Sequence, residues 1–194
     1  MPDETKRTLN APWAVRLAQG IADNNRFAGS LVAGLTQKQL NWQPAPGSWS
    51  VGQCVEHLCA TNNSYLTPIR EALAGRADSP ADEIHPGWFA RWFLRNFVEP
   101  SPGGKHAKAP AKIQPAPQVE PSVLDRFLAS NEALGEVISQ AQRKDVNRIR
   151  FKNPFVPAIR FTVGAGFEIL VLHERRHLLQ AERARNAAGF PASA

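Results

Sequence analysis

Two histidines near the end of the chain have the spacing of metal ligands on a helix. They stand in the sequence HERRH, which begins at His173 and ends at His177. Residues four apart are neighbours on a helix surface, so both imidazoles can reach one ion. The spelling H-E-x-x-H is also that of zinc proteases. Here two arginines separate the histidines and only 17 residues follow His177, so the sequence argues against proteolysis.

A catalytic metal ion needs a third protein ligand and an open position. His85 precedes a proline in a turn, and His106 lies in the loop sequence GGKHAKAP, so neither position is preorganised. His57 follows an S-x-x-Q capping box that predicts a helix start at Ser50. His57 would then lie on the flank of this helix. There it either meets a partner helix or stays on the surface with a hydrogen bond.

Apolar residues at helical spacing predict the elements that position these side chains. Four long helices are expected at residues 12–35, 50–75, 122–143 and 160–186, and no strand is expected. The connection between the second and third helices is long. The sequence therefore predicts an all-α four-helix bundle with a long crossover connection between helices 2 and 3. We expect one domain over residues 1–194, with an insertion of loop and short helix at about 76–120.

The insertion contains GWFARWFLRNF at residues 87–97, an aromatic stretch with helical spacing and interleaved arginines. Such a stripe is compatible with contact to a membrane surface. A lid over a pocket or a cover on the core is favoured, because the segment is short and no second anchor is visible. A non-catalytic bundle that binds a ligand or a protein partner through this segment is the alternative to an enzyme.

The residues between the two histidines differ in their expected environment. Glu174 falls within the apolar stripe of the predicted fourth helix, where a buried carboxylate needs a partner. It either supports a metal-bound histidine or pairs with an arginine of another helix. Arg175 and Arg176 project to the opposite side and are expected to face solvent. Leu172 and Leu179 make this helix apolar on two sides, which favours a homodimer.

The composition excludes several classes of protein. There are 23 Lys and Arg against 17 Asp and Glu, but no nucleic-acid-binding motif accompanies this net charge of +6. No apolar run approaches the roughly 20 residues of a transmembrane helix, and no signal peptide is visible. Cys54 and Cys59 are expected to be reduced thiols, which predicts a cytoplasmic protein. Cys54 is expected to be a buried apolar residue rather than a fourth metal ligand.

The sequence WQPAPGSWSVGQCVEHL at residues 42–58 resembles the hallmark of the DinB-like superfamily. The match continues on the last helix with H-x-x-x-H and a glutamine three residues later, and it spans about residues 10–187. The resemblance implies that His57, His173 and His177 bind one divalent transition metal (Zn, Ni, Fe or Mn), with water completing the shell. Some similar proteins are S-transferases that use a low-molecular-weight thiol, and dimers are common.

Three neutral imidazoles would leave such an ion its full double charge, which lowers the pKa of a bound water or thiol towards about 7. The expected function is therefore a metal-dependent thiol S-transferase or hydrolase that acts on a small molecule. The long aromatic insertion and the two arginines between the ligands are particular to this chain, and they leave the substrate open.

Overall fold

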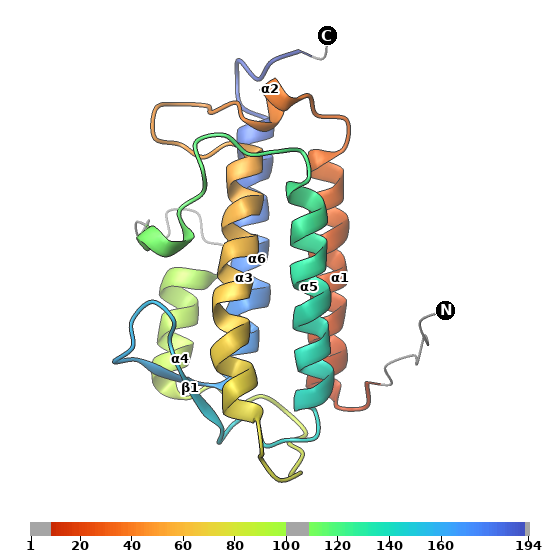
Figure 1. The fold of residues 1–194 in the computed structure, drawn as a ribbon, viewed down its shortest axis with the longest axis vertical. Helices are drawn as coiled ribbons and strands as arrows, with labels where there is room; N and C mark the ends of the chain where they lie inside the picture. Colours follow the sequence, from red (N-terminus) through yellow and green to blue (C-terminus); the bar gives the residue numbers. More distant parts are fainter. Residues whose placement is uncertain (1–8, 100–108, 193–194) are drawn as a thin grey trace.

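The computed structural model describes residues 9–99 and 109–192, and its main elements are four long helices (Figure 1). These are α1 (Pro12–Val32), α3 (Val51–Leu73), α5 (Val123–Ala141) and α6 (Val163–Arg185). The shorter elements are the helices α2 (Gln37–Leu40) and α4 (Trp88–Phe93), the π-helix η1 (Leu94–Val98), the 3-10 helix η2 (Ala111–Ile113) and the strands β1 (Arg150–Lys152) and β2 (Arg160–Thr162). The four-helix bundle predicted from the sequence is confirmed.

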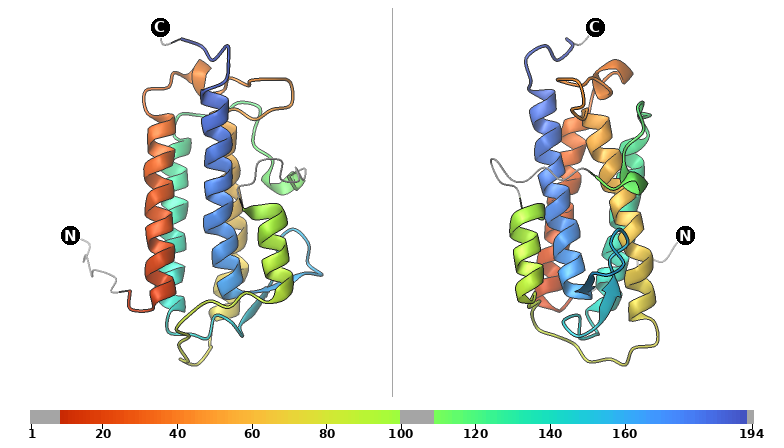
Figure 2. Two further views of the ribbon diagram at one scale, coloured as in Figure 1. Left: turned by 180° about the vertical axis from the view of Figure 1, so that it is seen from behind. Right: turned by 90° about the vertical axis from the view of Figure 1, so that its left-hand side faces the viewer.

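The long helices form a bundle in which each packs mainly on two others. α3 and α1 each lie between α5 and α6. α1 and α6 run in one direction along the bundle, and α3 and α5 run in the other (Figures 1 and 2). The connection from α3 to α5 carries α4, η1 and η2 and returns the chain to the end of the bundle where α3 begins. It is the predicted crossover, and it makes α3 and α5 parallel neighbours.

A two-stranded antiparallel hairpin precedes α6, and the expectation of no strand is wrong at this point. Phe151 of β1 stands opposite Phe161 of β2, and both side chains are buried. Each strand has three residues, too few for an alternating pattern to be recognised in the sequence. The hairpin fixes the start of α6, because Thr162 is the N-cap residue and its Oγ1 accepts a hydrogen bond from Ala165 N at 3.3 Å.

The apolar interior is divided into two clusters. One fills the end of the bundle near the hairpin and contains Trp13 and Phe167, and the other fills the opposite end and contains Phe127 and Leu178. Four polar side chains lie between the clusters, one from each long helix, and none is more than 2% exposed. We call them the polar layer: Asn24, Asn62, Asn131 and Glu174.

The aromatic segment of the crossover is helical and covers one side of the bundle. Ala90, Leu94 and Val98 are buried, and Phe89 and Phe93 pack on Phe161 with ring centroids 5.9 and 5.2 Å apart. This side of the segment therefore acts as a cover on the core. Among the residues that the structure describes, no helix combines the length and apolar character needed to cross a membrane.

Candidate metal centre

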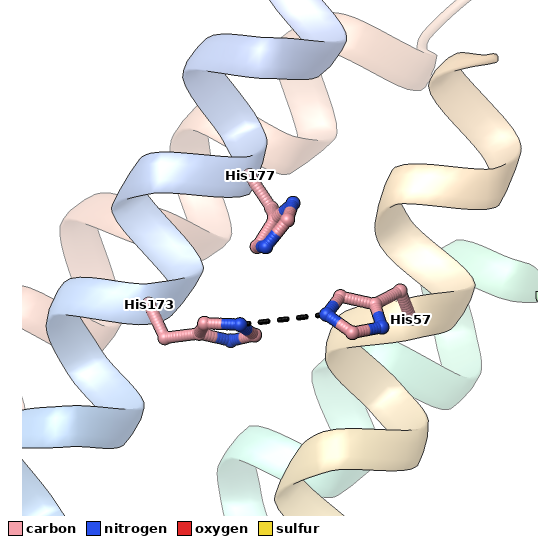
Figure 3. Close-up of side chains that lie close together, drawn as sticks. All are labelled: His57, His173 and His177. Atoms are coloured by element: carbon pink, nitrogen blue, oxygen red, sulfur yellow. Dashed lines mark hydrogen bonds between the residues drawn. The ribbon is translucent and has the colours of Figure 1, made fainter. Parts of the chain in front are cut away.

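The structure brings the three histidines named in the sequence analysis together (Figure 3). His57 projects from α3 towards His173 and His177 on the facing α6. One ring nitrogen of each histidine lies within 4.8 Å of one ring nitrogen of the others. The Nε2 atoms of His57 and His173 are 3.4 Å apart. We call these residues the histidine cluster.

His57 is held in place by the start of α3 and by the crossover. The capping box is formed as predicted: Gln53 N donates to Ser50 Oγ, and Ser50 N donates to Gln53 Oε1, both at 3.1 Å. His57 follows one turn later. Its Nδ1 lies 2.8 Å from Ile113 O in η2, so Nδ1 carries the proton and donates it. The lone pair of the neutral ring is then on Nε2, the atom that faces α6.

The crossover loop after η2 is joined to α3 by two further hydrogen bonds near His57. Gln53 Nε2 donates to Ala116 O at 3.0 Å, and Ala116 N donates to Glu56 Oε2 at 2.7 Å. These bonds hold the backbone around Ile113 against the flank of α3. The carbonyl oxygen that orients the His57 ring therefore belongs to a well-anchored loop.

His177 has an orienting partner on its own helix. Its Nδ1 lies 2.9 Å from Gln180 Oε1, an arrangement in which Nδ1–H donates and Nε2 keeps its lone pair. Trp49, the residue before the helix cap, lies against the cluster. Its ring centroid is 4.7 Å from that of His57 and 5.6 Å from that of His177. Trp49 thus shields two of the imidazoles from water on one side.

All three histidines are held in the neutral form. Burial lowers the pKa of His57, and burial together with the neighbouring imidazoles lowers the pKa of His173 well below its usual range. Burial and the neighbouring His57 imidazole, which would repel a second positive charge, lower the pKa of His177 to about 3. Neutral imidazole is the form that binds a metal ion, so at neutral pH the cluster presents three nitrogen ligands without releasing protons first.

The surroundings of Glu174 differ from both expectations. Within the described residues its carboxylate contacts neither a histidine nor an arginine. It accepts hydrogen bonds from the side-chain amides of Asn62 at 2.9 Å, Asn24 at 3.0 Å and Asn131 at 3.3 Å. The three other long helices each supply one of these amide donors. Burial raises the pKa of Glu174 to about 7.

The expectation for Arg176 is also wrong. Its side chain is half-buried, and Nη1 donates to Phe97 O in η1 at 3.1 Å. Arg175 is exposed, as expected, and lies over the ring of Phe27 at 4.5 Å. Arg176 thus joins α6, next to His177, to the aromatic segment of the crossover.

The remaining candidate ligands lie elsewhere. Cys54 is fully buried among apolar residues, burial raises its pKa to about 12, and it is not part of the described group of ligand atoms. His85 is exposed. His106 lies outside the described residues. Among the described residues, the group of side chains that could hold a metal ion is therefore His57, His173 and His177.

The chain matches a family model described as the DinB superfamily over residues 28–181. Among solved structures it is similar to YfiT from Bacillus subtilis, described as a probable metal-dependent hydrolase with an unusual four-helix bundle topology. The two share 16% sequence identity and superpose with a TM-score of 0.59, over 98% of this chain and 94% of YfiT. A comparison with curated proteins gives no match. The family match spans most of the chain, so the chain belongs to the DinB superfamily.

Proposed function

We propose that His57, His173 and His177 hold one divalent transition metal and that the chain is a metal-dependent hydrolase of a small molecule. The observation that carries the proposal is the arrangement of the nitrogens. Two of the three rings, those of His57 and His177, use Nδ1 for an orienting hydrogen bond and keep Nε2 for a ligand. A ligand histidine almost always has such a partner on its other nitrogen. The description of YfiT supports the same class of reaction.

The donor set fits a metal ion of the zinc, nickel, iron or manganese type. Neutral imidazoles suit these ions, and the half-buried His173 and His177 leave one side of the cluster open to a further ligand. A divalent ion held by neutral ligands alone lowers the pKa of a water or thiol bound to it. The residues of the chain orient the ligand rings through Ile113 and Gln180, and Trp49 limits access of water.

A thiol S-transferase is the second candidate, because the same three ligands would accept a thiol in the open position. The two reactions are separated by their co-substrate, which is water in one and a low-molecular-weight thiol in the other. The homodimer expected from Leu172 and Leu179 is also a proposal, and in the monomer both side chains are half-buried.

Elemental analysis of protein purified without chelator tests the metal proposal. We expect about one transition-metal ion per chain, and an apoprotein whose melting temperature rises when zinc, nickel, iron or manganese is added. Metal-loaded protein is then assayed with activated esters and amides, and separately with a thiol and an electrophile. Apoprotein that binds none of the four ions would contradict the proposal. A loaded enzyme that turns over only in the presence of thiol would favour the transferase.

Gln180 is expected to tune the metal affinity without being a ligand. Replacing it by alanine removes the acceptor of His177 Nδ1–H, and we expect metal affinity to fall about 10- to 100-fold. Gln180→Glu keeps an acceptor at this position and serves as the matched control, with affinity at least as high as that of the wild type. Competition with a chromophoric chelator measures both values. Equal affinities for Gln180→Ala and the wild type would show that the hydrogen bond does not orient the ring.

A further inference from the structure

The helical segment formed by α4 and η1 has one largely exposed face, where Trp92 rests on Phe89 and Phe97 of the same segment and Arg91 Nη1 donates to Pro86 O at 2.8 Å. Trp88 is 76% exposed and Trp92 is 47% exposed. Arg91 and Arg95 are exposed as well. These residues follow one another at helical spacings of three, one and three, so they share one side of the segment. We call them the Trp-Arg face. Figure 2 shows the segment on the outside of the bundle beside α6.

The opposite side of the segment prevents the two tryptophans from turning inward. Leu94 and Val98 are 7% and 2% exposed, and η1 packs on α6. The half-buried Phe89 is stacked between Phe161 and Trp92, with ring centroids 5.9 and 5.8 Å away. The core-facing side of the segment is therefore occupied by its contacts with α6 and Phe161. Two neighbouring indoles that stay exposed on a packed helical segment indicate an interaction surface.

We propose that the Trp-Arg face binds the surface of an anionic phospholipid bilayer, as a peripheral contact. Indole rings favour the boundary between headgroups and acyl chains, where the ring is apolar and its N–H is hydrated. Guanidinium groups bind phosphate, and the four residues of the face are neutral or cationic, with the exposed Glu99 following the end of η1. The net charge of +6 adds a long-range attraction to a negatively charged membrane.

Two other occupants fit the face less well. In a two-fold dimer through this face, the same patch would meet itself and bring Arg91 and Arg95 of both copies together, which is repulsive. A nucleic acid would be held mainly through phosphate contacts, and two arginines supply few of them. The pairing of exposed indoles with a small number of cations is the composition of a membrane-interface segment.

Flotation of the full chain with lipid vesicles tests the proposal. We expect binding to phosphatidylcholine vesicles that contain about a quarter phosphatidylglycerol, and much weaker binding to pure phosphatidylcholine. Arg91→Gln with Arg95→Gln should weaken binding to the anionic vesicles about 25-fold, at about fivefold for each charge. Trp88→Ser with Trp92→Ser should weaken it about tenfold or more. High salt should reduce binding of the wild type.

The matched control removes exposed apolar surface elsewhere. Val15 and Val156 are 49% and 47% exposed, so Val15→Ser with Val156→Ser should leave vesicle binding unchanged. Circular dichroism and melting temperature establish that each variant is folded. The proposal would be overturned if the wild type binds neither kind of vesicle. It would equally be overturned if the folded variant Trp88→Ser with Trp92→Ser binds the anionic vesicles as the wild type does. It would also be overturned if the face captures RNA or a second copy of the chain while binding no vesicle.

Discussion

Replacing His57 with alanine is expected to lower the affinity for a divalent metal roughly 100- to 1000-fold. His57 is the only member of the described histidine cluster that α3 supplies. His173 and His177 would remain as a two-ligand site on one helix. Structural zinc sites with four ligands bind with about 10–16 kcal/mol, which is about 2.5–4 kcal/mol per ligand. A loss of that size corresponds to two or three orders of magnitude in the dissociation constant.

The same variant separates metal binding from folding. Isothermal titration of the apoprotein with zinc measures the affinity, and the melting temperature of the metal-free protein reports on the fold. His85→Ala is the matched control, because His85 is exposed and its side chain is remote from the cluster in sequence and fold. It should bind metal as the wild type does. Unchanged zinc affinity in His57→Ala would mean that α3 supplies no ligand and that the proposed centre is wrong.

Replacing Glu174 with alanine is expected to lower the free energy of unfolding by about 2–4 kcal/mol. The change opens a cavity in the polar layer and removes the acceptor that Asn24, Asn62 and Asn131 share. Each buried donor left without a partner costs about 1–3 kcal/mol, and the asparagines keep part of their bonding through other acceptors. Urea denaturation of the metal-free protein measures the loss. A change below about 0.5 kcal/mol, the size typical of surface substitutions, would contradict this account.

The variant Glu174→Gln tests the raised pKa of Glu174 through the pH dependence of the free energy of unfolding. Burial raises the pKa of Glu174 from 4.5 to about 7, so the folded protein binds this proton more tightly than the unfolded chain does. The resulting stability is fully present below pH 4.5 and is lost as the pH rises through 7. Between these limits the wild type should lose roughly 3 kcal/mol relative to Glu174→Gln, which does not titrate.

The histidines of the cluster titrate over an overlapping range with the opposite sign. Their pKa values are lowered in the folded protein, so they contribute stability that is present above pH 6.5 and is lost on acidification. They are common to the wild type and Glu174→Gln, so their effect cancels in the difference between the two proteins. A difference that does not change from pH 4 to 8 would show that Glu174 ionises as it does in an unfolded chain.

The sequence was sufficient to predict the helices and the pair of His173 and His177 because both depend on local spacing. The capping box at Ser50 set the start of α3, and the i,i+4 pair set His173 and His177 on one side of α6. Placing His57 opposite them needed more than spacing. From the residues alone His57 was either a ligand or a surface histidine, and the family resemblance decided between the two. In the structure the three rings lie together, and their role as metal ligands stays a prediction.

The partners of Glu174 were missed although a signal for them was present. Asn62 stands at a core position of its helix, four residues after Leu58 and three before Tyr65. Asn131 stands likewise between Phe127 and Leu134. Polar residues at core spacing predict a buried hydrogen-bonding group. Which groups meet depends on the register between helices, which spacing within one helix does not determine.

Arg176 shows a second reason why burial cannot always be predicted from the sequence of one helix. A projection of α6 places it away from the apolar stripe, and this predicts exposure when the bundle is considered alone. The crossover segment supplies a second packing surface outside the bundle, where Phe97 O accepts its hydrogen bond. The position of that segment follows from tertiary packing of its aromatic residues rather than from any pattern in α6.

The polar layer also affects where members of the family can gain or lose residues. Because Glu174 bonds to an asparagine on each of the other long helices, the alignment of the helices is determined inside the bundle and not by the loops that join them. The entropy of closing a loop grows only slowly with the number of residues in it. Insertions and deletions between α3 and α5 that spare the backbone around Ile113 can therefore accumulate while His57 keeps facing α6. The crossover is the part of the chain in which we expect relatives to diverge most.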